Sequence, residues 1–169
     1  MSERGTHLAI AGARAGAAGG RPDAESVRAI VAAVPDPELP VVGIGDLGML
    51  HRVELRGDAI VVTILPTFIG CPALDALGGA IADALTGTGL PVRVETTFEV
   101  PWSSDRITPA GLAALRDAGI APPAGPADLR CPYCASARVV MDSAFGPTQC
   151  RSLCYCRDCR QPFEAMKQV

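Results

Sequence analysis

Two neighbouring segments show the clearest alternation of apolar and polar residues in the chain. Residues 49–55 alternate, Gly57-Asp58 supplies turn residues, and the apolar run 59–65 resumes as a strand. Two strand-length segments on either side of a tight turn predict a β-hairpin. The second of these strands is rich in β-branched residues, which is typical of a buried strand.

Segments with helical spacing lie on both sides of this hairpin. Asp23 is a predicted N-cap for a helix that ends at Pro35. Apolar residues recur at helical spacing over 72–85, and residues 92–100 alternate as a third strand. The order helix, strand, strand, helix, strand predicts an α+β fold, built as a small two-layer domain.

The segment after the third strand carries the only tryptophan of the chain, Trp102, which we expect to anchor packing. Thr108 and Pro109 form a good N-cap and first-turn pair for a third helix, which ends near Gly119. A proline-rich stretch follows and is a stiff linker.

Composition divides the chain into four segments. The N-terminus is rich in glycine and alanine without periodicity, so it has little to bury and is predicted to be disordered. Six of the seven cysteines fall after residue 130, which marks a separate C-terminal module. The predicted segments are a disordered leader over 1–21, the α+β domain over 22–120, the proline-rich linker over 121–129, and a zinc ribbon over 130–169.

The C-terminal module contains two Cys-x-x-Cys pairs, Cys131 with Cys134 and Cys156 with Cys159. Each pair offers two thiolates from one turn, and two such turns complete a tetrahedral site with four sulfur ligands. About 40 residues build too small a core, so the metal must supply much of the folding free energy. The residues favour structural zinc, with a single iron as the alternative.

Cys71 lies where an apolar strand ends and a helical pattern begins. A cysteine beside a helix N-terminus is near unpaired backbone N–H groups, which favour the thiolate. We therefore expect Cys71 to be a reactive thiol or a ligand of iron. The alternative is a packed cysteine, and neither His7 nor His51 is placed to act as its base.

Cys150 and Cys154 lack a partner at Cys-x-x-Cys spacing. One interpretation is that both are packed or surface thiols. The other is that Cys150, together with Cys71, transiently holds iron or an iron-sulfur cluster.

Charge and hydropathy exclude several classes of protein. Residues 1–126 carry nine basic and fourteen acidic side chains, and residues 127–169 carry six and four. This is not the strong basic field of a protein that depends on phosphate contacts, so a nucleic-acid partner is disfavoured. Charged, glycine or proline residues interrupt every apolar run, so we expect no membrane partner and a cytoplasmic location. The sequence leaves the oligomeric state open, including a homo-oligomer.

Three motifs resemble the small domain of SufT-like iron-sulfur assembly proteins. They are Asp36-Pro-Glu-Leu-Pro-Val-Val, Asp46-Leu-Gly48 and Pro66-Thr67-Phe-Ile-Gly-Cys71-Pro72. The resemblance implies that Cys71 is the working residue, with Asp46 and Thr67 as supporting residues.

The remainder resembles the PaaD (also PaaJ) family of bacterial phenylacetate degradation. The motifs are Pro101-Trp102-Ser-Ser-Asp-Arg-Ile-Thr-Pro109, Gly119-Ile-Ala-Pro-Pro123 and the cysteine-rich ribbon. This resemblance implies an accessory subunit of the multicomponent phenylacetyl-CoA epoxidase, whose partners are an oxygenase subunit and an iron-sulfur flavoprotein reductase. The implied task is to mature or maintain the iron-sulfur centre, rather than to catalyse the oxidation alone.

Three functions from different classes therefore remain open. The first is a maturation factor that works through Cys71. The second is a structural docking subunit in which Cys71 is only packed, and the third, less favoured, is a zinc-ribbon nucleic-acid-binding module.

Overall fold

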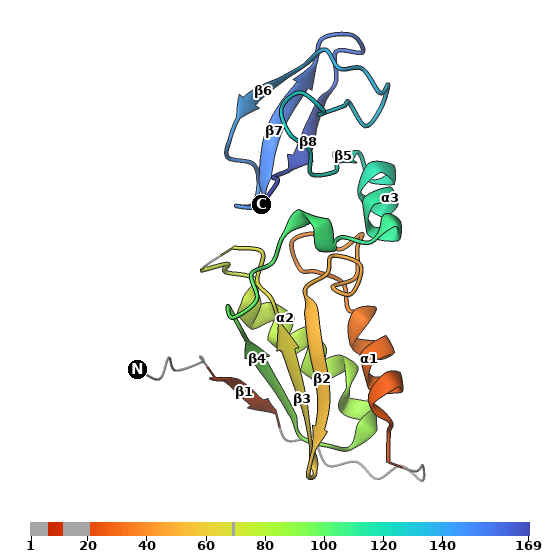
Figure 1. Cartoon of the computed structure of the whole chain (residues 1–169), viewed down its shortest axis with the longest axis vertical. Helices are drawn as coiled ribbons and strands as arrows, with labels where there is room; N and C mark the ends of the chain where they lie inside the picture. Colours follow the sequence, from red (N-terminus) through yellow and green to blue (C-terminus); the bar gives the residue numbers. More distant parts are fainter. Residues whose placement is uncertain (1–6, 12–20, 69) are drawn as a thin grey trace.

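The computed structural model describes residues 7–11, 21–68 and 70–169. Its regular elements form a first group around one sheet and a second group around another (Figure 1). The first group is β1 (His7–Ala11), α1 (Ala24–Ala32), β2 (Leu50–Arg56), β3 (Ala59–Ile64), α2 (Leu74–Ala84) and β4 (Val92–Thr96). The second group is α3 (Pro109–Asp117), β5 (Ile120–Ala121), β6 (Val139–Ser143), β7 (Arg151–Cys156) and β8 (Pro162–Met166).

The first sheet has the strand order β1-β4-β3-β2. β2 and β3 form the predicted hairpin, with Gly57 at a φ of 58° in its turn. β3 and β4 are parallel, and α2 provides the connection between them. The predicted α+β order of helix, hairpin, helix and strand is confirmed.

α1 and α3 begin at the residues that the capping rules select. The Asp23 carboxylate accepts a hydrogen bond from the backbone N–H of Ser26 at 2.8 Å, which caps α1. The Thr108 hydroxyl accepts one from the N–H of Gly111 at 3.1 Å, which caps α3. Both caps satisfy donors that would otherwise have no partner in the first helical turn.

One part of the predicted leader is ordered, which corrects that expectation. Residues 7–11 form β1, which pairs antiparallel with β4, so that Leu8 lies opposite Val94. The reason is that β4 would otherwise be an edge strand with free backbone groups, and β1 supplies partners for them. The rest of the leader, residues 1–6 and 12–20, lies outside the described residues.

The main core fills the space between α1, α2 and the first sheet. Val27 and Val31 of α1, Leu77 and Ile81 of α2, and Val62 of β3 have no solvent exposure. Helices on one face of a sheet give the two-layer arrangement seen in Figure 1.

The second sheet has the strand order β5-β8-β7-β6 and a core of its own. That core includes Cys154, Cys156, Phe163 and Ala165. Ala121, where the predicted linker begins, belongs to β5, which pairs parallel with β8. The second sheet therefore includes two residues that precede the cysteine-rich segment.

The two sheets meet through buried residues of the connecting segment. The indole N–H of Trp102 donates to the carbonyl of Leu47 at 2.8 Å, and Trp102 is 5% exposed, which confirms its predicted packing role. Ile120 and Met166, from the second sheet, belong to the main core. The C-terminus ends at this junction, where the backbone of Val169 bonds to Ser104 (Figure 1).

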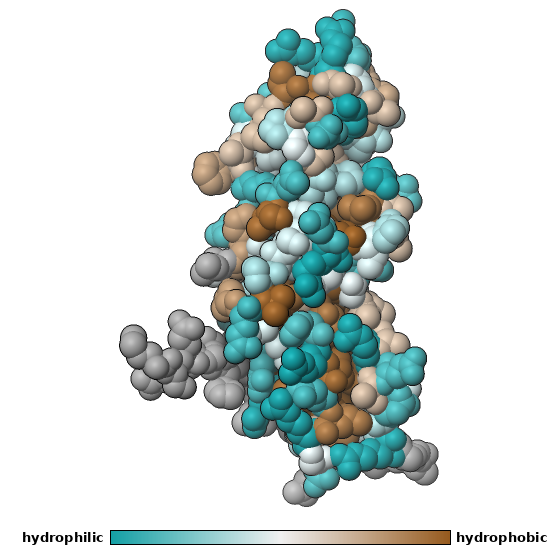
Figure 2. Space-filling model, in the orientation of Figure 1, coloured by the Kyte–Doolittle hydropathy of each residue, from teal (hydrophilic) through white to brown (hydrophobic). Residues whose placement is uncertain are grey.

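The face of the molecule in Figure 2 carries both hydrophilic and hydrophobic residues. Large exposed apolar side chains include Val41, Tyr133, Met141 and Phe145. Within the described residues, no helix is long and apolar enough to cross a membrane.

Candidate functional site: a closed four-sulfur site and an interdomain thiol cavity

The two Cys-x-x-Cys turns bring four sulfur atoms together. The Sγ atoms of Cys131, Cys134, Cys156 and Cys159 lie within 4.8 Å of one another. Cys131 and Cys159 are 3.6 Å apart, as are Cys134 and Cys156. A tetrahedral zinc with Zn–S bonds of about 2.3 Å places its sulfurs about 3.8 Å apart. The four thiolates therefore fit a structural zinc ion.

Both turns of this four-sulfur site have the same backbone geometry. The N–H of Ala135 donates to the carbonyl of Cys131, and the N–H of Arg160 donates to that of Cys156, each at 2.9 Å. Ala135 and Arg160 have φ values of 58° and 60°, which non-glycine residues rarely adopt. Such backbone strain persists only where surrounding contacts hold the residue in place, and a metal bound by both turns would hold Ala135 and Arg160 in this conformation.

A carboxylate links the two turns at the surface. Asp158, inside the second turn, accepts hydrogen bonds from the Ser136 hydroxyl and from the Arg138 guanidinium. Asp158 therefore holds the two turns in register from outside the sulfur site.

Cys156 and Cys159 differ in their thiol pKa before metal binds. Backbone N–H groups of Cys159 and Asp158 lower the pKa of Cys156 to about 6. Burial, together with the neighbouring sulfurs, raises the pKa of Cys159 to about 12. Zinc binding requires all four as thiolates, so it displaces protons.

Cys71 lies just before α2, but its acidity differs from our expectation. The helix begins at Leu74 with Ala73 at the N-cap, and the backbone N–H of Ala73 lowers the pKa of Cys71. Burial raises that pKa more strongly, and the charges of Glu38 and Asp36 add to the increase. Burial therefore outweighs the helix start, and the pKa of Cys71 lies above its ordinary value.

A small cavity of about 10 Å³ brings Cys71 and Cys150 together. Thr67, Asp36 and Glu38 also line this cavity, which we call the interdomain thiol cavity. Its remaining lining residues are Leu39, Leu47, Met49, Ala73, Leu74, Leu77 and Met166. Two thiols from separate domains and two carboxylates thus surround one enclosed space.

Cys150 enters this cavity from the turn before β7. It is 6% exposed, and its sulfur lies 3.1 Å from the Thr148 hydroxyl and 3.8 Å from a carboxylate oxygen of Glu38. Burial raises the pKa of Cys150, and the charge of Glu38 adds to the increase, while Arg151 opposes it. Both cavity thiols are therefore protonated at neutral pH.

The acidic turn that carries Glu38 is held by a buried aspartate. Asp36 is 7% exposed, and its Oδ1 accepts the backbone N–H groups of Glu38 and Leu39 at 2.9 and 2.8 Å. Burial raises the pKa of Asp36. Neither Asp36 nor Glu38 was among the residues that the sequence predicted to form a site. The available signal was that Asp36 and Glu38 lie in one of the motifs that carry the resemblance.

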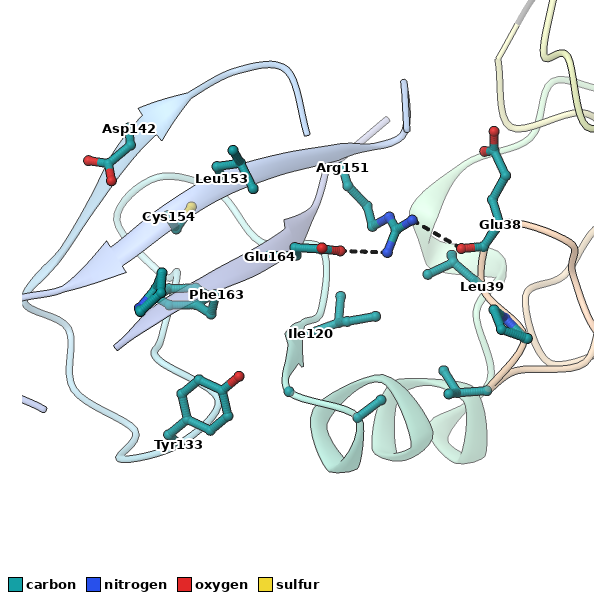
Figure 3. Close-up of a pocket in the computed structure, with 15 residues that line it drawn as sticks. Glu38, Leu39, Ile120, Tyr133, Asp142, Arg151, Leu153, Cys154, Phe163 and Glu164 are labelled. Atoms are coloured by element: carbon teal, nitrogen blue, oxygen red, sulfur yellow. Dashed lines mark hydrogen bonds and ion pairs between the residues drawn. The ribbon is translucent and has the colours of Figure 1, made fainter. Parts of the chain in front are cut away.

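Arg151 connects the acidic turn to the second sheet (Figure 3). Its guanidinium donates to the backbone carbonyl of Glu38 at 3.1 Å and forms an ion pair with Glu164. The side chain of Arg151 is 12% exposed. Because Cys150 is the preceding residue, these contacts fix the cavity thiol relative to the first domain.

A larger cavity of about 590 Å³ is also lined by Arg151, Glu38 and Glu164 (Figure 3). Its walls come from residues 38–41, from the end of α3 and from the second sheet. Leu153 and Phe163 are among its apolar lining residues, and Tyr133 lies at its edge. Cavities of this size at domain junctions are common ligand or partner sites.

The remaining sequence candidates occupy other places. Asp46 accepts a hydrogen bond from the Thr108 hydroxyl at 2.6 Å, and among the described residues it is outside the lining of the interdomain thiol cavity. This hydrogen bond ties Asp46 to the start of α3. Cys154 is 1% exposed in the core of the second sheet. Thr67 does lie beside Cys71 in the cavity lining.

Comparisons with known proteins match the two parts of the chain separately. Residues 24–97 match the family described as iron-sulfur cluster assembly protein, and residues 118–167 match the PaaD zinc beta ribbon domain. The region that matches the first family includes Cys71, and the region that matches the second includes Cys150. The cavity between them is therefore built from both family domains.

Solved structures resemble the first domain. A crystal structure of a domain of unknown function, DUF59, from Bacillus anthracis is 28% identical, with a TM-score of 0.50, over 54% of this chain and 90% of that one. A solution structure from Mycobacterium tuberculosis, of a protein associated with Fe-S complex assembly and repair, is 30% identical over 56% of this chain and 84% of that one, with a TM-score of 0.34.

A relative from Escherichia coli (strain K12) matches over nearly its whole length. Its name, which is provisional, is that of a subunit of 1,2-phenylacetyl-CoA epoxidase, and it is 41% identical over 156 residues, which are 88% of this chain and 94% of the relative. Since both family domains are also present in order, the chain belongs to the PaaD family of phenylacetyl-CoA epoxidase subunits.

Proposed function

We propose that this chain matures or maintains the iron-sulfur centre of a multicomponent phenylacetyl-CoA epoxidase. The observation that carries the proposal is that Cys71 and Cys150, from two different domains, line one cavity with two carboxylates. Thiolates are the usual protein ligands of iron-sulfur centres. Two thiols that are protonated without metal suit transient binding of iron or a cluster, which is the cargo of such a protein.

The chain's own residues prepare this cavity for a cation. Glu38 and Asp36 place negative charge beside both sulfurs. This charge disfavours a thiolate without a metal, and it attracts a cation. Asp36 fixes the turn that carries Glu38, and Arg151 fixes the backbone of Glu38 to the second sheet. Apolar residues line the cavity around both thiols, where Cys150 is buried and Cys71 is half-buried.

The ribbon metal has a structural part in this proposal. Cys131, Cys134, Cys156 and Cys159 would hold zinc, which supplies a cross-link between two turns and no open position for a substrate. Cys156 ends β7, and Cys150 and Arg151 lie at its start. A folded ribbon is therefore needed to bring Cys150 to Cys71.

The proposed partners are the oxygenase subunit and the iron-sulfur flavoprotein reductase of the same complex. The name of the Escherichia coli relative, as a subunit, supports an assembly with other chains. The reductase is the proposed recipient, because it carries the iron-sulfur centre in that kind of complex.

A structural docking subunit is the second candidate function. The larger cavity favours it, because apolar side chains such as Leu153 and Val41 are 40% and 49% exposed there. Nucleic-acid binding has less support, because Arg138 and Arg151 of the ribbon are engaged in ion pairs with carboxylates.

The test is the metal content of the partner complex. The oxygenase complex is purified from cells with the chain, without it, and with Cys71→Ser, and its iron and sulfide are measured. We expect the complex to lose iron and sulfide both without the chain and with Cys71→Ser. Full iron and sulfide with Cys71→Ser, combined with a complex that falls apart without the chain, would favour the docking subunit instead.

A further inference from the structure

The size of the interdomain thiol cavity limits what it can hold. Its volume of about 10 Å³ corresponds to roughly one water-sized sphere. Leu39, Leu47, Leu77 and Met166, each at most 3% exposed, form its apolar walls. Even the smallest iron-sulfur cluster contains two irons and two sulfides, so it is several times larger than this space.

The groups that face the cavity form a donor set for one metal ion. They are two thiols, from Cys71 and Cys150, and the carboxylate of Glu38, whose Oε2 lies 3.8 Å from the Cys150 sulfur. Thiolate sulfur and carboxylate oxygen together suit a borderline divalent ion such as ferrous iron. Carboxylate-only sites, by comparison, favour magnesium or calcium.

We infer that the interdomain thiol cavity binds a single divalent transition-metal ion, ferrous iron as cargo, through Cys71, Cys150 and Glu38, before any cluster is assembled. This inference rests on the proposed maturation role and narrows its cargo from iron or a cluster to one ion. The three donors come from both domains, so the ion is held only when the domains are joined.

The donor arrangement also explains why such an ion would be released. Among the described residues, the ribbon cysteines are the group whose donor atoms all lie within 4.8 Å of one another. The cavity donors are spread more widely, so binding an ion requires their side chains to rotate inward. Three protein donors also leave coordination positions open to a recipient's ligands.

The binding step balances without a redox partner. One divalent ion enters, Cys71 and Cys150 each lose a proton, and the two thiolates become metal ligands with the carboxylate of Glu38. Two protons leave for each ion bound. The metal keeps its oxidation state.

Cobalt(II) is the probe, because its thiolate complexes absorb through sulfur-to-metal charge transfer. The zinc-loaded full chain is titrated anaerobically, and its zinc content is measured before and after. We expect one cobalt per chain beyond the zinc, and ferrous iron should compete for the same site only when it is in excess. Cys71→Ser and Cys150→Ser should each weaken binding by about 100-fold, and Glu38→Gln by about 10-fold.

Cys154→Ser is the matched control, because Cys154 is the one other cysteine outside the ribbon set and is buried in the second core. It should leave cobalt binding unchanged. A zinc content of one per chain in every variant shows that the ribbon is folded. The inference is overturned if no cobalt binds beyond the zinc site, or if binding survives both cavity cysteine substitutions.

Adding sulfide with iron separates this inference from the proposed function. If iron alone does not bind, while iron with sulfide forms a cluster that depends on Cys71, the single-ion inference fails and the maturation role stands. If iron alone binds, while the partner complex keeps full iron and sulfide with Cys71→Ser, the maturation role fails and the ion site stands.

Discussion

The chain places its cysteines in two sites that use the same donor atom in opposite ways. The ribbon site gathers four sulfurs within 4.8 Å, from two turns of matching geometry. The interdomain thiol cavity holds two sulfurs with carboxylates beside them, in a space of about 10 Å³. Four converged thiolates form a closed metal site, whereas in our proposal the two cavity thiols would bind an ion and release it.

The two sites differ in what brings their ligands together, and this difference would decide whether a metal stays bound or is passed on. In the ribbon, each Cys-x-x-Cys turn supplies two ligands by local spacing, and both turns belong to the same domain, so the site forms when that domain folds. In the cavity, the ligands depend on the contact between two domains, through Arg151 and the acidic turn at Glu38. The stability of that contact therefore controls the second site without changing the first.

Zinc removal should have the largest effect on the two sites. A strong chelator should unfold β6, β7 and β8, because structural zinc contributes on the order of 10 kcal/mol to such small modules. The first sheet should remain folded on its own core. Hydrogen exchange followed by mass spectrometry would show this as loss of protection confined to residues 139–166. Retained protection there after zinc removal would show that the ribbon folds without metal.

Arg151→Gln should loosen the domain contact while leaving the ribbon site intact. It removes a mostly buried guanidinium that bonds to Glu38 and Glu164, so we expect a loss of about 1.5–3 kcal/mol in the free energy of unfolding. Denaturant titration measures the free energy of unfolding, and the zinc content per chain shows whether the ribbon site is intact.

Arg138→Gln is the matched control, because the side chain of Arg138 is 71% exposed in its ion pair with Asp158. Exposed pairs contribute about 0–1 kcal/mol. Equal losses for Arg151→Gln and Arg138→Gln would mean that Arg151 does not secure the domain contact.

The sequence could predict the features that depend on residues close together in the chain. These are the hairpin, the helix caps at Asp23 and Thr108, and the two Cys-x-x-Cys turns. The meeting of Cys71 with Cys150 depends on how two domains pack, so the sequence could offer it only as one interpretation. The same limit applies to β1, whose partner strand β4 is distant in sequence.

The sequence also could not show how deeply each site residue is buried. The position of Cys71 before a helix predicted a thiolate, but its apolar surroundings and Glu38 reverse the balance. Likewise, Asp46 lies in a motif that suggested support for Cys71, and the fold uses it to bond Thr108. Motif membership therefore identified important residues without giving their contacts.

The raised pKa of Cys71 predicts how its alkylation depends on pH. Since the ordinary thiol pKa is 9.0 and burial raises it further, the reactive thiolate is scarce at pH 7. The rate of reaction with iodoacetamide should increase about tenfold per pH unit from pH 7 to 9. A rate that levels off near pH 7 would show a lowered pKa. Zinc-bound ribbon cysteines should stay unreactive throughout, as mass spectrometry of the labelled peptides would reveal.

Glu38→Gln should change this rate by a smaller factor. Removing the charge beside Cys71 lowers its pKa, so alkylation at pH 8 should become a few times faster in metal-free cavities. Glu25→Gln, on the exposed surface of α1, is the control and should leave the rate unchanged. A slower or unchanged alkylation rate with Glu38→Gln would show that the charge of Glu38 does not raise the pKa of Cys71.

Arg160→Gly should have the smallest effect and belongs to the ribbon alone. Its φ of 60° suits glycine, so the substitution should stabilise the zinc-bound chain by about 0.5–1 kcal/mol. Thermal unfolding of the zinc-loaded chain measures the gain. A destabilised ribbon would indicate that the arginine side chain has a role beyond the turn.

Iron and sulfide in the partner complex test most directly whether Cys71 and Cys150 form one working site. The complex is purified from cells that carry Cys71→Ser, Cys150→Ser, both substitutions, or Cys154→Ser. We predict that each cavity substitution lowers iron and sulfide to the same level, that the double substitution lowers them no further, and that Cys154→Ser leaves them unchanged. Normal iron and sulfide with Cys150→Ser, or losses that add in the double variant, would contradict a single site shared by the two domains.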